Sequence, residues 1–430
     1  MIDQVLPPAQ APVVSAAIFK AYDIRGIVET ALTEEAVSAI GLALGAKARA
    51  RGIGQVVVGR DGRLSGPALA RALSAGLCAA GVDVIDIGMV PTPLVYFATV
   101  LTGCGTGVAV TGSHNPPEYN GLKMMLGGAT LHGEDIRDIA ATLADPARYA
   151  ALFAATPGTV RTLDVVPDYI ARIAGEVKLA RPLKVVVDAG NGVAGAVAPA
   201  LLRALGITDL TELYCEVDGH FPNHHPDPAH PENLRDLIRE VQARDADIGL
   251  AFDGDGDRLG VVTRSGQMIF PDRQLMLYAA DVLEKNPGAT IIYDVKCTRN
   301  LAPWIRERGG EPLMWCTGHS LVKAKMKETG AKLAGEMSGH IFFNDRWYGF
   351  DDGLYTAARL LEILARVPDP GALLEGLPDA SSTPELQVPL AEGENAALVQ
   401  ALRERGRFEG AEIITVDGLR VEYPDGFGLV

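Results

Sequence analysis

Short runs of apolar, often β-branched residues alternate along the chain with longer segments rich in alanine and leucine. Three stretches repeat one order of strand-like run, glycine-rich turn, helix-like segment and second apolar run: residues 56–88, 184–214 and 290–316. Strands that alternate with helices of this length are typical of βαβ units and parallel sheets. The recurrence predicts an α/β fold class with three similar α/β domains, rather than a short-period solenoid.

Proline and glycine gather between these periodic segments, and a chain of 430 residues is too long for a single hydrophobic core. The breaks lie near residues 155–160, 264–272 and 376–386. The domains that we expect are residues 1–158, 159–267, 268–379 and, as a smaller C-terminal piece, 380–430.

The overall charge bears on the partners of the chain. Its 39 basic and 54 acidic residues give a formal net charge of −15, which repels polyanions and argues against nucleic acid as a partner. Five scattered cysteines without a C-x-x-C spacing are expected of reduced thiols. The N-terminus, with Asp3, lacks the pattern of a signal peptide, and no stretch approaches the roughly 20 uninterrupted apolar residues of a membrane span. We expect a cytoplasmic protein that does not contact a membrane.

Three aspartates stand at alternate positions in AFDGDGDRLG, directly after an apolar run. The glycines between Asp253, Asp255 and Asp257 let the backbone aim all three carboxylates at one point. Like charges this close repel one another unless a cation lies among them, and oxygen ligands suit Mg²⁺. An EF-hand calcium loop is excluded because Arg258 and Arg264 stand where it needs Gly and Glu. A solvated acidic turn is the alternative.

Two further stretches have competing interpretations. DAGNGVAG places Gly190, Gly192 and Gly195 in a G-x-G-x-x-G pattern, with Glu216 near the distance of a ribose-binding acid. An NAD-linked oxidoreductase is therefore a competing hypothesis, but we favour a plain strand-to-helix turn because the two parallel stretches lack the pattern. In GHFPNHHPDPAHPENL a zinc site is imaginable, although its prolines favour a stiff extended loop.

Ser113 stands between a glycine and a histidine in VTGSHNPPEYNG, at the end of an apolar run. Most serines in such a setting are ordinary turn residues, so its interpretation depends on the rest of the chain.

Five motifs occur along the chain in the order FKAYDIRG, TGSHNPPEYNGLK, FDGDGDR, TGHS and GEMSGH. With them the chain resembles the α-D-phosphohexomutase superfamily, most closely its bacterial phosphomannomutase/phosphoglucomutase branch. The resemblance implies four domains around one central cleft. Three of them would share a topology with mixed, largely parallel sheets, and the smaller C-terminal one would be α+β.

The resemblance also implies an activity, the interconversion of hexose 1-phosphate and hexose 6-phosphate for mannose and glucose. The reaction would pass through a phosphoserine at Ser113 and a 1,6-bisphosphate intermediate, with glucose 1,6-bisphosphate as activator. Mg²⁺ would bind Ser113, Asp253, Asp255 and Asp257. A transferred phosphate needs such neutralisation of its charge.

Further roles follow from the positions of the family motifs. Lys123, His114 and His340 are the candidates for general acid and base, and the sequence does not choose between them. Arg25 and Arg258 would steady the reacting phosphate. The implied substrate-binding residues are Tyr22, Lys296, His319, Glu336 and Ser338.

The sugar and the chain end carry the remaining expectations. Glu336 and Ser338 would read O3 and O4, and Met337 between them indicates the mannose/glucose branch rather than the phosphoglucosamine branch, which usually has glutamine there. Family members carry an R-x-S-N-T-x-P phosphate loop soon after a segment like YPDGFGLV, where this sequence ends. We therefore expect reduced activity and poor packing of residues 418–427.

The expected partners are small-molecule hexose phosphates, with no nucleic acid and no membrane, and a monomer is favoured. Two alternatives stay open: a phosphoglucosamine mutase, and a non-catalytic sugar-phosphate-binding protein.

Overall fold

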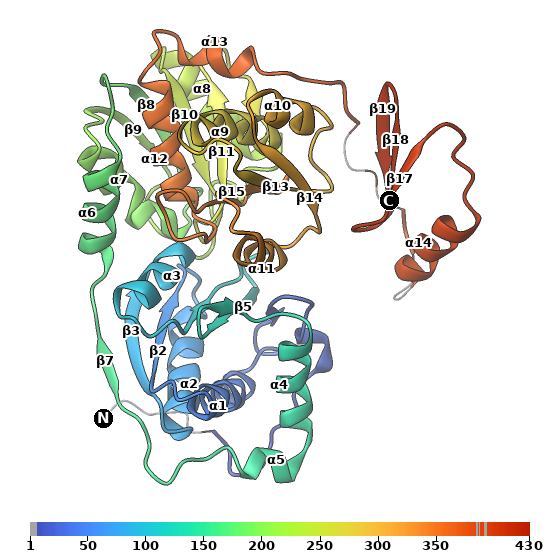
Figure 1. The fold of residues 1–430 in the computed structure, drawn as a ribbon. Coiled ribbons are helices and arrows are strands. Elements are labelled where there is room, and N and C mark those ends of the chain that lie inside the picture. Colours follow the sequence, from blue (N-terminus) through green and yellow to red (C-terminus); the bar gives the residue numbers. More distant parts are fainter. Residues whose placement is uncertain (1–6, 384–385, 387, 391–393) are drawn as a thin grey trace. The chain divides into compact units, whose positions relative to one another are not determined.

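The computed structural model describes residues 7–383, 386, 388–390 and 394–430. They fall into two compact units, one of Met1–Ile269 with Phe350–Leu373 and the other of Phe270–Gly349 with Leu374–Val430. Figure 1 labels most of the helices and strands of both. Asp3, which bears on the predicted lack of a signal peptide, lies outside the described residues.

The first sheet belongs to the first unit. Its strands are β1 (Ile24–Ile27), β2 (Gln55–Arg60), β3 (Asp83–Met89), β4 (Gly107–Val110), β5 (Tyr119–Leu126), β6 (Ala129–Thr130) and β7 (Val160–Thr162). Their order is β1-β5-β4-β2-β3-β7, with β6 paired to β5. The pairs among β4, β2, β3 and β7 are parallel, whereas β5 is antiparallel to β1, β4 and β6. The accompanying helices are η1 (Ala16–Ile18), α1 (Glu34–Ala50), α2 (Gly66–Ala79), α3 (Thr92–Leu101), α4 (Glu134–Ala144) and α5 (Pro146–Ala150).

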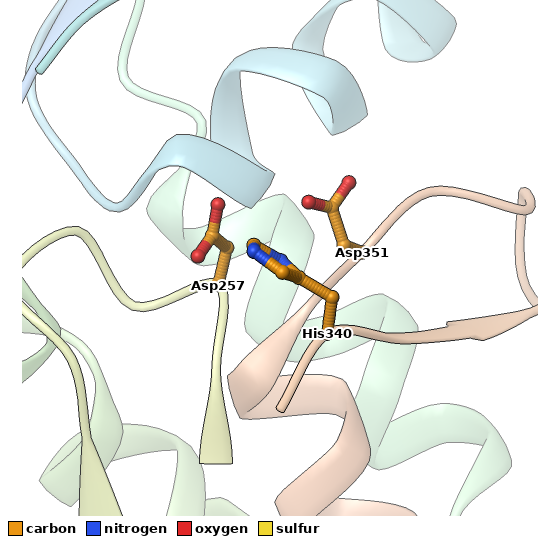
Figure 2. Close-up of side chains that lie close together, drawn as sticks. All are labelled: Asp257, His340 and Asp351. Carbon is orange, nitrogen blue, oxygen red and sulfur yellow. The ribbon is translucent and has the colours of Figure 1, made fainter. Parts of the chain in front are cut away.

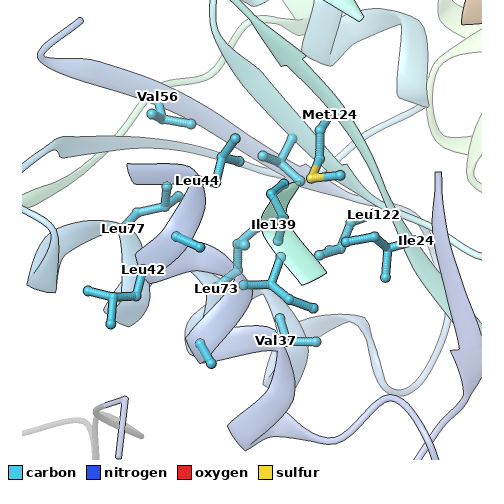
Figure 3. Close-up of a cluster of buried hydrophobic side chains, with 14 of the residues drawn as sticks. Ile24, Val37, Leu42, Leu44, Val56, Leu73, Leu77, Leu122, Met124 and Ile139 are labelled. Carbon is cyan, nitrogen blue, oxygen red and sulfur yellow. The ribbon is translucent and has the colours of Figure 1, made fainter. Parts of the chain in front are cut away.

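Helices α1 and α2 pack closely under this sheet. A Cβ on Gly76 would lie 1.9 Å from the carbonyl oxygen of Ser38, so the helices can approach this far only because residue 76 is glycine. Figure 3 shows the apolar core that results, with side chains from the helices facing those of the strands. Its labelled members are Ile24, Val37, Leu42, Leu44, Val56, Leu73, Leu77, Leu122, Met124 and Ile139.

The second sheet also lies in the first unit. It runs β12 (Met268–Ile269), β11 (Leu259–Thr263), β10 (Ile248–Phe252), β8 (Lys184–Asp188), β9 (Asp209–Leu213). Helix α6 (Val166–Glu176) precedes its strands along the chain, and the helices between them are η2 (Val193–Ala196), α7 (Ala198–Ala204), η3 (Pro231–Leu234) and α8 (Arg235–Arg244). A later helix, α12 (Gly353–Leu364), contacts β10 and β11 although it falls within the predicted third domain. Asp352 caps α12 by accepting a hydrogen bond from the Tyr355 amide at 2.9 Å.

The second unit holds the third sheet, in the order β14 (Glu311–Trp315), β13 (Thr290–Asp294), β15 (Leu333–Gly335), β16 (Ile341–Phe343). Its helices are α9 (Pro271–Lys285), α10 (Leu301–Glu307) and α11 (His319–Thr329), and α13 (Pro370–Glu375) follows α12. The C-terminal part consists of α14 (Glu394–Arg405) and a small antiparallel sheet of β17 (Glu412–Ile414), β18 (Arg420–Tyr423) and β19 (Gly426–Leu429).

The packing predicted for residues 418–427 is partly wrong. Strand β18 pairs with both neighbours, and Leu419, Arg420 and Val421 are buried. The guanidinium of Arg420 donates to the carbonyl oxygens of Val295 and Cys297, at 2.5 and 2.8 Å. These hydrogen bonds of Arg420 anchor the small sheet to the rest of the second unit. The sequence pattern did not reveal them.

One topology recurs in the three larger sheets, in the orders β3-β2-β4-β5, β9-β8-β10-β11 and β14-β13-β15-β16. In each, three parallel strands are followed by one antiparallel strand. The prediction of three similar α/β domains with mixed sheets is confirmed, as is a smaller C-terminal domain. A short loop joins the last two strands in every case, and these loops carry the candidate chemistry. No helix in the described ranges is long and apolar enough to cross a membrane.

Candidate active site

Ser113 lies in the loop between β4 and β5 and is only 1% exposed. Its backbone is left-handed, with φ at 51°, which is uncommon for a residue other than glycine. Its amide donates to Thr111 Oγ1 at 2.8 Å, and its hydroxyl lies 3.2 Å from His114 Nδ1. The serine therefore sits on a sharp, fixed turn with an imidazole against its oxygen.

The aspartate loop occupies the same place in the second sheet, between β10 and β11. Asp253, Asp255 and Asp257 are fully buried, and one oxygen of each lies within 4.8 Å of the others. A Cβ on Gly254 would lie 2.4 Å from the Ser113 carbonyl oxygen, so the two loops are in backbone contact. The structure thus brings together the predicted carrier serine and the predicted metal ligands.

The three carboxylates fit a divalent cation. In the described part of the chain, Asp253 Oδ2 and Asp255 Oδ1 accept no hydrogen bond although both are buried; Arg258 Nε is 3.7 Å from the former. Burial, and then the charges of the other two aspartates, raise the pKa of Asp253 well above its usual range. Buried carboxylate oxygens with unmet demand for positive charge are the ligands that Mg²⁺ prefers.

Lys123, on β5, supplies part of that charge. Its Nζ lies 2.8 Å from Asp255 Oδ2 and 2.5 Å from Asp257 Oδ2. Burial alone would lower the pKa of Lys123, but the two carboxylates outweigh it and hold the pKa well above its ordinary value. In this arrangement Lys123 is a firmly held cation.

Two arginines and a histidine complete this part of the site. Arg25, on β1, donates to Asn115 Oδ1 in the serine loop and to Asp23 Oδ2 at 2.6 Å. Burial and the charges of Arg258 and Arg25 lower the pKa of His114 to about 2, so its imidazole is neutral. Tyr22, in the bend before β1, is 38% exposed.

The other predicted residues lie in the second unit, at the carboxyl ends of its parallel strands. Lys296 follows β13, His319 begins α11 after β14, and Glu336, Ser338 and His340 lie between β15 and β16. Glu336 Oε1 accepts from the Gly318 amide at 2.5 Å, and Glu336 Oε2 accepts from the Ser338 hydroxyl at 3.2 Å. The rings of His319 and His340 stack with centroids 5.6 Å apart. The structure brings these motifs to one edge of the third sheet.

Several residues of the site were not predicted. Asp294, at the end of β13, accepts from the Met337 amide at 3.2 Å and from Thr317 Oγ1 at 3.0 Å, and so ties the two substrate loops together. The sequence signal for Asp294 was a carboxylate at the end of a strand-like run, IIYD. Asp351 is another: one of its oxygens lies within 4.8 Å of one of Asp257, and Figure 2 shows both side chains.

The competing motifs have structural partners of their own. Gly195 would place a Cβ 2.2 Å from the Cys215 carbonyl oxygen, and Val193 donates to Gly254 O at 3.2 Å, so this turn packs against neighbouring backbone. In the histidine stretch, His224 Nε2 lies 3.1 Å from both oxygens of Asp188, and His225 Nε2 contacts the His114 carbonyl oxygen.

Comparisons with known proteins bear on these observations. Family profiles described as phosphoglucomutase/phosphomannomutase alpha/beta/alpha domains I, II and III match residues 16–149, 167–266 and 270–380. A phosphoglucomutase of Neisseria gonorrhoeae is 57% identical over 96% of this chain and 89% of its own length. A phosphomannomutase/phosphoglucomutase of Pseudomonas aeruginosa is 53% identical over 98% of this chain and 90% of its own. The crystal structure of a phosphoglucomutase/phosphomannomutase family protein from Burkholderia thailandensis is 61% identical with a TM-score of 0.92, covering 97% of this chain and 90% of that one.

Over nearly its whole length the chain is similar to enzymes that move a phosphoryl group within a hexose phosphate, and it has their fold. The chain belongs to the phosphoglucomutase/phosphomannomutase family. It is an enzyme, a phosphotransferase with hexose phosphate mutase activity. The family depends on magnesium, with which the aspartate cluster agrees.

Proposed function

We propose that this mutase interconverts the 1- and 6-phosphates of glucose and mannose, with Ser113 as the phosphoryl carrier. The observation that carries the proposal is the backbone contact between Ser113 and Gly254, the glycine inside the aspartate cluster. A serine that donates and accepts phosphate needs a fixed geometry and an adjacent source of positive charge. Both are present around Ser113.

The reaction consists of two transfers. In the first, the P–O bond to Ser113 Oγ breaks and a new P–O bond forms to the free hydroxyl of a hexose 1-phosphate, whose proton passes to a base. The product is a hexose 1,6-bisphosphate. In the second, its other phosphoryl group returns to Ser113 Oγ, a proton returns to the sugar oxygen, and hexose 6-phosphate leaves. Bound glucose 1,6-bisphosphate would also phosphorylate an unmodified Ser113.

The candidate residues have distinct tasks in this scheme. Asp253, Asp255 and Asp257, with an oxygen on Ser113, would hold Mg²⁺, which supplies positive charge to the phosphoryl group. Arg25 and Arg258 would neutralise the charge of phosphate oxygens. His114, Lys123 and His340 stay the candidates for proton transfer, and the 3.2 Å separation of His114 Nδ1 from Ser113 Oγ supports the first.

The sugar is read by the second unit in this proposal. Glu336 holds its two oxygens toward Gly318 and Ser338, an arrangement suited to adjacent hydroxyls such as O3 and O4. Glucose and mannose share these hydroxyls and differ at C2, so both fit. Tyr22, Lys296 and His319 are proposed to bind the rest of the substrate. The predicted domain limits, cytoplasmic location, monomeric state and central cleft stay predictions.

The test is peptide-resolved mass spectrometry of the protein after incubation with glucose 1,6-bisphosphate and Mg²⁺. Phosphate on Ser113 that is lost to added hexose 1-phosphate is expected, and Ser113→Ala abolishes both labelling and turnover. Ser265→Ala, at an exposed serine, serves as the control. Turnover by Ser113→Ala at the rate of the parent protein would refute the carrier role. Turnover on glucosamine 1-phosphate that exceeds turnover on glucose and mannose 1-phosphates would favour the phosphoglucosamine alternative.

A further inference from the structure

Asp61 and Arg63 lie in the turn after β2 and have no role in the scheme above. Both are almost completely buried, Arg63 with 1% of its surface exposed. Arginine is among the side chains least often buried unless it is paired. A guanidinium in this position has to find acceptors for five N–H donors inside the protein.

The acceptors of Arg63 are concentrated on the serine loop. Both terminal nitrogens donate to backbone carbonyl groups there, and Nε donates to Asp61 Oδ2 at 3.2 Å. The carbonyl oxygens belong to Ser113 (2.8 Å), Asn115 (2.6 Å), Pro116 (2.5 Å) and Tyr119 (2.9 Å). Residue 112 has to be glycine for this, since a Cβ there would lie 2.4 Å from Arg63 Cζ.

Asp61 extends the same set of contacts. Its Oδ2 also accepts from Thr111 Oγ1 at 2.8 Å and from the Gly112 amide at 3.1 Å. Thr111 Oγ1 in turn accepts from the Ser113 amide at 2.8 Å. The carboxylate thus balances the charge of Arg63 and reaches the serine through one hydroxyl, so the loop is held from both sides of residue 113.

The hydrogen bonds of Arg63 to carbonyl groups go to the loop and not to the strand pairing of the sheet. Strands β4 and β5 pair through residues 107–110 and 122–125 without Arg63. The carbonyl groups that it binds follow this ladder, in the stretch that contains the left-handed Ser113. A sparsely populated backbone conformation persists only where its surroundings over-determine it. Arg63 and Asp61 provide that restraint.

We propose that the Asp61–Arg63 pair is a positioning device for the carrier serine: it fixes the backbone of residues 111–119 so that Ser113 Oγ is aimed at the reacting phosphorus. The inference rests on the proposed role of Ser113. The pair acts through the loop and touches neither substrate nor metal in this scheme. Its loss is expected to slow phosphoryl transfer while leaving the affinity for sugar phosphate unchanged.

The experiment compares Arg63→Lys and Arg63→Ala with the parent protein, and uses Arg71→Ala, at an exposed position of α2, as a matched control. Lysine keeps the charge but cannot fork to four carbonyl groups. For both Arg63 variants the single-turnover rate of transfer from phosphorylated Ser113 to glucose 1-phosphate should fall at least about tenfold. KM should stay within about twofold, because uniform substrate binding is not removed.

Two readouts separate positioning from general destabilisation. Amide exchange should accelerate in peptides covering residues 111–119 and not in α1 or α2, and millimolar guanidinium should partly restore the rate of Arg63→Ala. The amount of phosphorylated Ser113 gives the active fraction, to which each rate is normalised. A normalised rate equal to that of the parent, in Arg63→Lys or Arg63→Ala, would overturn the proposal.

The same data distinguish failure of this inference from failure of the proposed function. If Ser113→Ala keeps its turnover, the carrier role itself is wrong and the positioning role falls with it. If Ser113→Ala is inactive but Arg63→Lys transfers phosphate at the parent rate, only the positioning role is wrong. Should Arg63→Ala not fold, Arg63→Lys carries the test alone.

Discussion

The carbonyl oxygen of Ser113 lies 2.4 Å from the point that a Cβ on Gly254 would occupy. Residue 254 separates the first two aspartates of the cluster, so the loop that carries the serine touches the loop that carries the carboxylates. This backbone contact holds a loop of the first sheet against a loop of the second sheet. In the proposed function it keeps the carrier serine beside the residues that would hold Mg²⁺.

Replacement of Gly254 by alanine should therefore cost activity rather than folding. The added methyl group has to push the two loops apart, and a displacement of about 1 Å in an active site can cost about 100-fold in rate. We expect kcat of Gly254→Ala to fall by about that factor with a small change in melting temperature. Gly175→Ala, where nothing lies within 4 Å of the new Cβ, should behave like the parent. Equal kinetics for the two variants would show that the contact is not needed.

Replacement of an aspartate in the cluster should have opposite effects on stability without metal and with metal. Burial and two neighbouring carboxylates oppose the charge of Asp253, so Asp253→Asn should raise the melting temperature of the metal-free protein. Mg²⁺ should stabilise the parent by mass action and should not stabilise the variant. Thermal unfolding with EDTA and with excess Mg²⁺ measures both effects. Asp245→Asn, at an exposed position, is the control, and retention of the full Mg²⁺ effect in Asp253→Asn would contradict the ligand assignment.

Much of the fold and part of the site could be predicted because the signals are local in sequence. Alternating strand and helix patterns predicted three similar α/β domains. The aspartates of the predicted metal site stand at alternate positions of one loop. The carrier role of Ser113 could be predicted only from the resemblance, which rests on five motifs spread over residues 19–340. The alternating patterns are complete within each repeated stretch, and the aspartate motif is complete within one loop.

The residues that were missed act across long separations. Arg63 binds a loop 50 residues away, and Asp351 approaches Asp257 only because α12 returns to contact β10 and β11. Hydrophobic period and turn chemistry do not report such contacts. The same holds for Arg420, whose partners Val295 and Cys297 lie more than 120 residues earlier.

Stability should depend on the protonation of Asp352. Burial raises the pKa of this carboxyl group from 3.8 to about 7, against the hydrogen bonds that it receives from Tyr355 and Tyr169. The native state therefore keeps a proton that the unfolded chain releases near pH 4. The stabilising contribution is complete below pH 3.8 and is lost as the pH rises to about 7, by up to about 4 kcal/mol at about 1.4 kcal/mol per pH unit.

Asp352→Asn isolates this contribution, because asparagine is also a good N-cap but does not titrate. Denaturant unfolding at pH 5 and pH 8 should show a larger loss of unfolding free energy for the parent than for the variant. Tyr169→Phe removes a donor to the carboxylate and should extend the loss to higher pH. Parallel pH profiles for the parent and Asp352→Asn would show that this group does not titrate between the two states.

Recognition of the sugar should be lost evenly for glucose and mannose when Glu336 is neutralised. In Glu336→Gln, one of the two acceptor oxygens becomes an NH₂ group, which only donates, so the hydrogen bond from either the Gly318 amide or the Ser338 hydroxyl loses its acceptor. Because O3 and O4 are common to both sugars, kcat/KM should fall by a similar factor for glucose 1-phosphate and mannose 1-phosphate, about 10-fold to 100-fold for one charge-assisted hydrogen bond. Steady-state assays with both substrates give the two ratios. A loss confined to one sugar would mean that Glu336 reads C2, and would move the specificity for O3 and O4 to other residues of this unit.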